Sequence, residues 1–140
     1  MVMVVRFLLD TNVISKPTKP RPNQKVLRLL SEYSNYLSTA TVAYHEISFG
    51  FLRMSESRKK REIEAYIRQN IEGAIVLLPY CDIAAKWHAQ ERSRLKRLGR
   101  TPPFLDGQIA AVAANNLTLV TRNVDDFQHF QDLQLENWFE

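Results

Sequence analysis

The sequence has a single cysteine, few glycines and prolines, and no long apolar run. Cys81 by itself excludes an internal disulfide and any metal site built from several cysteines, and we expect it to be a small buried side chain. Four Gly and six Pro in 140 residues are too few for a fibrous or low-complexity chain. No stretch approaches the roughly 18 apolar residues of a membrane-spanning helix. We therefore expect a cytoplasmic protein without a membrane anchor.

The remaining composition is that of a globular domain whose charges are unevenly placed. With 140 residues, of which 45% are hydrophobic, the chain is expected to form one domain over residues 1–140. Its net charge is +4, yet residues 53–100 hold 12 Lys and Arg against 6 Asp and Glu, whereas residues 101–140 hold 1 against 6. The basic excess permits a polyanionic partner, and the acidic segment is a candidate for chemistry.

Apolar runs alternate with amphipathic segments along the chain. Residues 3–9 form a nearly continuous apolar run, which is typical of a central strand covered on both faces. Further strands are expected at 36–40, 74–78, 117–121 and 133–135, and helices at about 26–33, 41–53, 56–71, 83–98, 101–116 and from 125. Thr41 is expected to be a helix N-cap and Gly99 to end the longest helix. This alternation predicts a layered α/β domain with a largely parallel sheet.

Acidic residues fall where such a sheet places its binding site. Asp10 directly follows the first strand, and Asp125 and Asp126 come a few residues after the strand at 117–121. Glu46 lies in the helix expected at about 41–53, and Asp106 lies near the start of the helix expected at about 101–116. Because ligands bind beyond the carboxyl ends of parallel strands, these acids are expected to converge at one edge.

Converging carboxylates repel one another, so they need a cation. Mg²⁺ prefers oxygen ligands and keeps several waters while it bridges a few carboxylates to phosphate oxygens, and Mn²⁺ has similar preferences. Such a site can activate water and neutralise charge on a phosphodiester. The acids therefore indicate metal-assisted hydrolysis of nucleic acid, with Mg²⁺ as the expected cofactor and Mn²⁺ as a substitute.

Four ordered motifs resemble those of the PIN-domain family. They are Leu9-Asp-Thr-Asn-Val-Ile-Ser15, Glu46 within Thr41-Val-Ala-Tyr-His-Glu-Ile-Ser-Phe-Gly50, Pro103-Phe-Leu-Asp-Gly-Gln-Ile-Ala-Ala111, and Thr121-Arg-Asn-Val-Asp-Asp-Phe127. Together they span nearly the whole chain, and they look most like the VapC and FitB branch of toxin ribonucleases. The resemblance implies a three-layer α/β/α domain with a central, mainly parallel sheet of about five short strands.

The same resemblance assigns roles to individual residues. It implies that Asp10 and Asp106 are the principal metal ligands and catalytic acids, and that Glu46 and Asp126 complete the site. Asp125 is adjacent to Asp126 and leaves the fourth acid open by one position. The resemblance also implies that four short polar side chains orient the acids and waters: Thr11, Asn12, Thr121 and Asn123. The pair Lys16-Pro17 departs from the family pattern, in which an acid often stands there.

The resemblance implies a Mg²⁺-dependent endoribonuclease that acts as the toxin of a type II toxin-antitoxin pair. The expected partners are an RNA substrate, a VapB/FitA-like antitoxin and a second copy of the chain in a homodimer. The alternative is a weakly active or non-catalytic PIN-domain component that acts with its antitoxin at promoter DNA. A flap-type or ribosome-processing nuclease is a third interpretation. Two basic groups, residues 58–61 and 92–100, are candidates either for RNA contact or for holding an acidic antitoxin tail.

Overall fold

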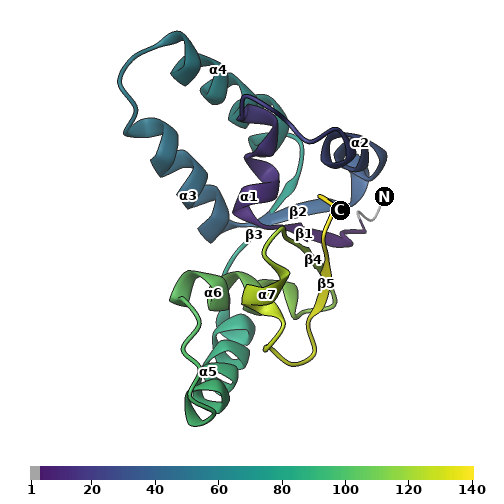
Figure 1. Cartoon of the computed structure of the whole chain (residues 1–140), viewed down its shortest axis with the longest axis vertical. Coiled ribbons are helices and arrows are strands. Elements are labelled where there is room, and N and C mark those ends of the chain that lie inside the picture. Colours follow the sequence, from purple (N-terminus) through teal and green to yellow (C-terminus); the bar gives the residue numbers. More distant parts are fainter. Residues whose placement is uncertain (1–3) are drawn as a thin grey trace.

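A five-stranded parallel sheet forms the centre of the protein, with helices on both of its faces (Figure 1). The structure is a computed structural model that describes residues 4–140. The strands are short: β1 (Phe7–Leu9), β2 (Leu37–Ala40), β3 (Val76–Leu78), β4 (Thr118–Val120) and β5 (Gln134–Glu136). Their order is β3-β2-β1-β4-β5, and all neighbouring strands are parallel. The predicted α/β class and mainly parallel sheet are therefore confirmed.

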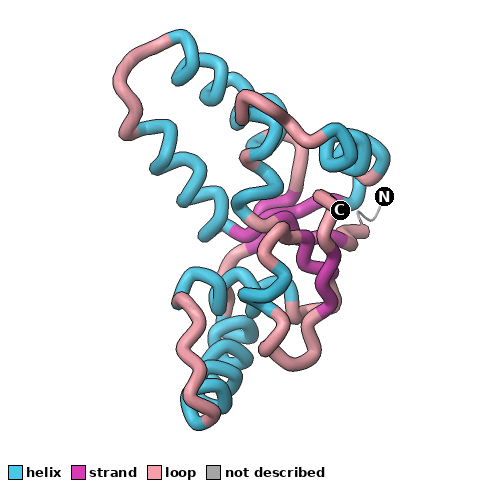
Figure 2. Tube along the Cα trace, in the orientation of Figure 1, coloured by secondary structure: helices cyan, strands magenta, loops and turns pink. Residues whose placement is uncertain are grey.

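The helices form the two outer layers of a three-layer α/β/α sandwich (Figure 2). One layer holds α1 (Thr11–Ile14), α2 (Gln24–Glu32), α3 (Thr41–Leu52) and α4 (Arg58–Ile67). The other holds α5 (Asp82–Arg97), α6 (Phe104–Ala113) and α7 (Val124–Phe127). Short helical turns occupy Lys16–Thr18, Ser34–Tyr36 and Arg68–Glu72. Within residues 4–140, no helix is both long and apolar enough to cross a bilayer.

The strand order reverses at β1, which fixes where a site can form. From β1 the chain builds outward to β2 and β3, and it then returns to place β4 on the other side of β1. Leu9 pairs with Val120 and with Thr39, so the carboxyl ends of the three central strands are level. In open parallel sheets, the crevice beyond such a reversal is where ligands bind.

Several element boundaries differ from the sequence-based predictions. The first strand covers Phe7–Leu9, all buried, and not the whole run from 3; residue 3 lies outside the described residues. Thr41 is the first residue of α3 rather than its N-cap, because Ala40 already has the extended N-cap backbone. The helix expected over 101–116 is α6, which begins only after Pro103. Gly99, with φ of 77°, ends the longest helix as predicted.

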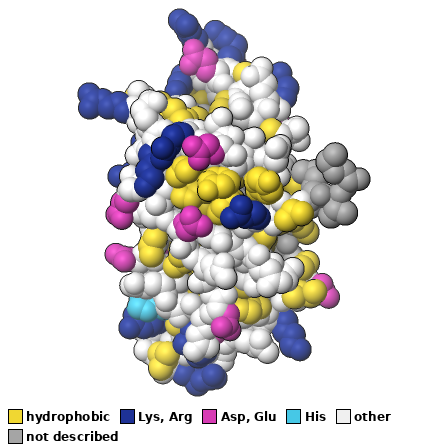
Figure 3. Space-filling view, turned by 90° about the vertical axis from the view of Figure 1, so that its right-hand side faces the viewer, with side chains coloured by type: hydrophobic (Ala, Val, Ile, Leu, Met, Phe, Trp, Pro, Cys, Tyr) yellow, Lys and Arg dark blue, Asp and Glu magenta, His cyan; other side chains and the backbone are white. Residues whose placement is uncertain are grey.

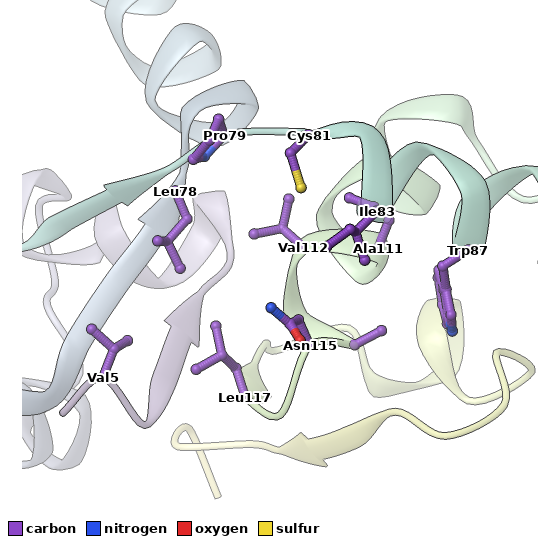
Figure 4. A pocket seen from close by; sticks show the side chains of 12 residues that line it. Val5, Leu78, Pro79, Cys81, Ile83, Trp87, Ala111, Val112, Asn115 and Leu117 are labelled. Atoms are coloured by element: carbon purple, nitrogen blue, oxygen red, sulfur yellow. The ribbon is translucent and has the colours of Figure 1, made fainter.

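The prediction that Cys81 is buried is wrong. Cys81 is exposed, because it occupies the N-cap position of α5, where the chain turns away from β3 at the surface. Figure 4 shows its thiol at an apolar hollow of about 360 Å³ between β3, α5 and α6. Its lining includes Leu78, Ile83 and Trp87. None of the predicted acids lines this hollow.

A glycine sets the distance between α5 and α6. A Cβ atom added to Gly107 would overlap Nε2 of His88 and lie 2.8 Å from its Cδ2. The His88 ring is buried, and its Nδ1 is 2.8 Å from the Tyr80 hydroxyl. Burial and the nearby Arg92 lower the pKa of His88, which keeps the ring neutral at physiological pH. The imidazole thus packs directly on the α6 backbone, one residue after Asp106.

We expect Gly107→Ala to lower the free energy of unfolding by about 1 to 3 kcal/mol, because the added methyl group must displace the His88 ring. In a His88→Ala background, the same change should cost at least about 1 kcal/mol less. Urea denaturation of the four proteins in this cycle measures the coupling. Gly50→Ala is the control, since nothing lies within 4 Å of its added Cβ in α3, and it should stabilise by about 0.5 to 1 kcal/mol. Equal penalties in both His88 backgrounds would contradict the proposed packing.

Candidate active site

The buried carboxylate of Asp10 lies at the point where the strand order reverses. Asp10 follows β1 directly and is 7% exposed. Its Oδ2 accepts a hydrogen bond of 2.8 Å from the hydroxyl of Thr121, which follows β4, and its Oδ1 accepts one of 2.8 Å from the Thr11 amide. Thr121 Oγ1 in turn accepts a bond of 3.0 Å from the Asn123 amide. One buried network therefore joins the ends of the two central strands and the start of the loop to α7.

The surroundings of Asp10 both oppose and support its negative charge. Burial raises its pKa most strongly, the hydrogen bonds from Thr121 and Thr11 lower it, and the charge of Asp126 raises it again. The net direction is upward. A cation placed beside this carboxylate would stabilise its charged form and lower its pKa.

Asp106 lies in the first turn of α6 and faces the same site. Burial, together with the charges of Asp10 and Asp126, raises its pKa to about 6. The upward shift occurs although a helix N-terminus favours negative charge, so desolvation and repulsion between the acids dominate. Asp10, Asp106 and Asp126 therefore act on one another electrostatically although they are far apart in the sequence.

Glu46 approaches from α3, on the other layer of helices. It lines the same hollow as Asp10 and Asp106, and its side chain remains 42% exposed. Nδ1 of His45 is 3.8 Å from Oε1 of Glu46. Glu46 is thus more solvated than Asp10 and can contact water.

The structure separates the two candidates for the fourth acid. Both Asp125 and Asp126 are exposed in the first turn of α7, and neither lines the hollow. Of these two acids, only Asp126 contributes to the raised pKa values of Asp10 and Asp106, and Asp125 does not. Asp126 therefore lies at the rim of the acidic site and favours the assignment made from the sequence pattern. Its chemical role stays a prediction.

The acids share an open hollow of about 440 Å³, which we call the acid pocket. Its lining is Asp10, Thr11, Asn12, Ser15, Lys19, Glu46, Leu105, Asp106, Ile109 and Asn123. Sequence reasoning missed Lys19, whose only local signal is a proline-rich loop. The cation noted in the sequence, Lys16, instead has its Nζ 6.0 Å from the centre of the Phe139 ring. Lys19 is thus the cation at the edge of the acid pocket.

Two features bear on whether a metal ion fits the acid pocket. Thr11 lines the pocket, and its buried hydroxyl oxygen has no hydrogen-bond partner within residues 4–140, which is uncommon for a buried polar atom and is consistent with binding of a polar ligand. Across the same residues, no three His, Cys, Asp or Glu side chains form a group that could hold an ion by themselves. The donor set fits a hard cation that takes one or two carboxylates and keeps water in its other positions.

Comparison with known proteins identifies the family. Residues 7–133 match the PIN domain, which is nearly the whole chain and includes all four acids. The chain belongs to the PIN-domain family. Toxin FitB of Neisseria gonorrhoeae is 36% identical over 127 residues, covering 86% of this chain and 90% of FitB. Ribonuclease VapC2 of Rickettsia felis is 28% identical over 138 residues, covering 94% of this chain and 97% of VapC2.

Solved structures agree with this assignment. The structure of FitAB bound to an IR36 DNA fragment has a TM-score of 0.87 to this PIN domain at 30% sequence identity, and the match covers 96% of each chain. The predicted resemblance to the FitB and VapC branch is therefore confirmed, as is the PIN-like sandwich.

The burial of Asp106 and its repulsion by Asp10 and Asp126 should make the metal-free protein less stable as the pH rises. Asp106 has a pKa of about 6 in the folded protein against 3.8 for an ordinary Asp, so folding is progressively penalised from about pH 4 upward, and the penalty is complete above about pH 6 to 7. Since the side chain is partly exposed, we expect Asp106→Asn to be more stable than the parent by about 1 to 2 kcal/mol at pH 7.5.

The two proteins should converge in stability below about pH 4, where the carboxyl group is protonated in both the folded and the unfolded state. Urea denaturation in EDTA from pH 3.5 to pH 8 measures this difference. Asp125→Asn is the matched control, because this acid does not act on Asp106, and its stability should differ by no more than about 0.5 kcal/mol. A constant offset between Asp106→Asn and the parent across the whole range would contradict the proposed origin.

Proposed function

We propose that this PIN-domain protein is a Mg²⁺-dependent endoribonuclease and the toxin of a type II toxin-antitoxin pair. The observation that carries the proposal is the electrostatic coupling of Asp10, Asp106 and Asp126 at the reversal of the strand order. Burial and neighbouring negative charge raise the pKa values of Asp10 and Asp106, which disfavours the metal-free fold. Binding of a divalent cation and a phosphodiester would explain why such acids are held together.

Asp10 and Asp106 are the residues that would hold the ion. Both line the acid pocket and both have raised pKa values, as expected for carboxylates that lack a cation. When bound, Mg²⁺ or Mn²⁺ would supply positive charge for the phosphate and a lowered pKa for a coordinated water. Glu46 and Asp126 complete the electrostatic environment from α3 and α7.

The side chains of this site have separable roles in phosphodiester hydrolysis. Thr121 and the Thr11 amide hold Asp10 in one orientation, and the Thr11 hydroxyl can bind a water in the acid pocket. The partly exposed Glu46 can accept a proton from the attacking water. The oxygen of that water then bonds to phosphorus as the bond between phosphorus and the leaving sugar oxygen breaks. Lys19 at the edge of the pocket is placed to contact the substrate phosphate.

The relatives support the biological setting of the proposal. FitB is named a toxin and VapC2 a ribonuclease, and a similar structure from Rickettsia felis contains VapBC2 bound to a DNA fragment from its promoter. We infer that this protein acts on RNA in the cytoplasm and is inhibited by a VapB/FitA-like antitoxin. Its assembly as a homodimer stays a prediction.

The DNA-bound relatives favour a second candidate function. The structures of FitAB and VapBC2 each contain a DNA fragment. They favour, as the alternative, a weakly active or non-catalytic component that joins an antitoxin at promoter DNA. The two functions make different demands on the acid pocket. A binding role does not need Asp106, whereas hydrolysis does, and expression in growing cells distinguishes them.

Purified protein with Mg²⁺ should cleave RNA, and Asp10→Asn and Asp106→Asn should each reduce the rate by at least about 100-fold, because each removes a carboxylate needed for metal binding and charge neutralisation. Electrophoresis of total RNA over time measures the rate, with Mn²⁺ as a second metal. Asp125→Asn should retain a rate within about twofold of the parent.

The same variants test the alternative in cells. Expression of the parent should arrest growth and Asp106→Asn should not, with mapped RNA 5′ ends appearing only in the parent. Growth arrest by both proteins with no new 5′ ends would contradict the ribonuclease and favour the binding role.

Metal binding should also be visible without any reaction. Saturation with Mg²⁺ at about 10 to 100 times its dissociation constant should raise the free energy of unfolding by about 1 to 3 kcal/mol. This gain should be lost in Asp10→Asn and in Asp106→Asn. Thermal denaturation with and without Mg²⁺ measures it, again with Asp125→Asn as the control. Equal stabilisation of all four proteins would contradict a metal ion in the acid pocket.

A further inference from the structure

A second hollow, rich in cations, lies between the end of α5 and the start of α6. Its volume is about 450 Å³, and we call it the basic hollow. It is lined by Ala89, Arg92, Ser93, Lys96, Arg100, Thr101, Pro102 and Phe104. Three of these residues carry positive charge and none carries negative charge. The lining therefore has the composition of an anion site.

The cations of the basic hollow are not neutralised by neighbouring acids. Within residues 4–140, Arg92, Lys96 and Arg100 take part in no ion pair. Arg100 donates instead to Nε2 of His129 at 3.0 Å. Arg94, on another side of α5, is occupied by Glu91 through two hydrogen bonds and by the His129 carbonyl oxygen. Arg92, Lys96 and Arg100 thus bring to the hollow three cations without an acidic partner in the described part of the chain.

The basic segment of α4 is arranged differently. Lys and Arg side chains gather at both ends of the long axis of the molecule (Figure 3), and α4 and α5 lie toward opposite ends (Figure 1). Along α4 and just after its end, three cations pair with acids four residues away: Arg58 with Glu62, Lys60 with Glu56, and Arg68 with Glu64. Within the described residues, Lys59 and Arg61 of α4 form no ion pair. Two basic groups that look alike in the sequence therefore differ in how much charge they offer a partner.

An exposed aromatic ring stands beside the free cations. Phe104 is 51% exposed, and the Arg92 guanidinium carbon is 5.1 Å from the centre of its ring. The buried His88 ring supports it from within the protein, with ring centres 5.0 Å apart. A ring held next to basic side chains is the combination that binds single-stranded nucleic acid, because the ring stacks on a base while the cations contact phosphates.

The basic hollow and the acid pocket are joined by consecutive residues at the start of α6. Phe104 lines the basic hollow, whereas Leu105 and Asp106 line the acid pocket. A strand bound across this point would pass directly from stacking on Phe104 to the acids. We propose that the basic hollow binds the single-stranded RNA next to the scissile phosphate, with Arg92, Lys96 and Arg100 on phosphates and Phe104 on a base. This inference rests on the proposed ribonuclease function.

The aromatic ring is what favours RNA over an acidic peptide tail. Cations alone would suit either partner, since both are polyanions. A partly exposed phenyl ring that faces the same hollow adds a stacking surface for a nucleobase, whereas an acidic side chain gains little from the face of the ring, which is itself negative. The composition of the basic hollow therefore fits a nucleotide better than a carboxylate.

Binding can be measured separately from cleavage. In EDTA, fluorescence anisotropy with a labelled single-stranded RNA of mixed sequence and about 20 nucleotides gives the affinity from about 50 to 200 mM salt. Arg92→Ala/Lys96→Ala should weaken binding at least 10-fold at the lower salt and reduce the slope of log affinity against log salt by about one to two. Arg58→Ala/Arg68→Ala removes equal charge from ion-paired positions at the start of α4 and just after its end, and it should change affinity less than about threefold.

Phe104→Leu tests stacking at nearly constant apolar character. It should weaken RNA binding by about 5- to 100-fold, and the loss should shrink on an abasic strand of the same length, which has phosphates but no bases. Circular dichroism and urea denaturation check that each variant is folded.

Three outcomes would overturn the inference. They are unchanged RNA affinity in the basic-hollow variants, an equal loss in the α4 control, or an equal Phe104→Leu penalty on the abasic strand. If the hollow variants keep RNA affinity but lose affinity for polyglutamate, the hollow holds an acidic peptide instead. A parent protein that binds RNA through the hollow but does not cleave it with Mg²⁺ would contradict only the proposed function.

Discussion

The hydrogen bond from Thr121 to the buried Asp10 connects the two central strands at the point where the candidate site forms. Asp10 follows β1 and Thr121 follows β4, so the 2.8 Å bond between them requires the parallel pairing of Leu9 with Val120. Burial of a carboxylate costs free energy, and the bonds from Thr121 and the Thr11 amide offset part of that cost. The position of every other acid is defined relative to this fixed carboxylate.

Packing elsewhere in the domain holds the acids close together although they repel one another. The raised pKa values of Asp10 and Asp106 mean that their charges disfavour the metal-free fold. What keeps Asp106 in place is the attachment of α6, whose backbone at Gly107 rests on the His88 ring of α5. A side chain at position 107 would push α6 away from α5 and shift the acid that precedes it. Packing of the core thus offsets the unfavourable free energy of holding the acids at the site.

The acids could be found in the sequence because their positions follow from strand ends. Asp10 and Asp126 come after apolar runs that could only be central strands, and parallel pairing brings such positions together. Features that depend on tertiary packing could not be found in this way. Lys19 reaches the acid pocket from an irregular loop, Cys81 is exposed because the chain turns there, and Ala40 takes the N-cap geometry ahead of Thr41 although its side chain cannot cap. Local preference gives no signal for any of these.

The uneven charge of the chain acquires a spatial meaning at the start of α6. The acidic C-terminal segment supplies Asp106 and Asp126 to one side of this point, and Arg92 and Lys96 of α5, together with Arg100 just after it, lie on the other side. On and beside α4, Arg58, Lys60 and Arg68 instead pair with acids four residues away, and Lys59 and Arg61 form no ion pair within the described residues. Total charge does not separate the two basic segments, whereas the spacing of acids along each segment does. It is this pairing pattern that concentrates usable positive charge beside the acids.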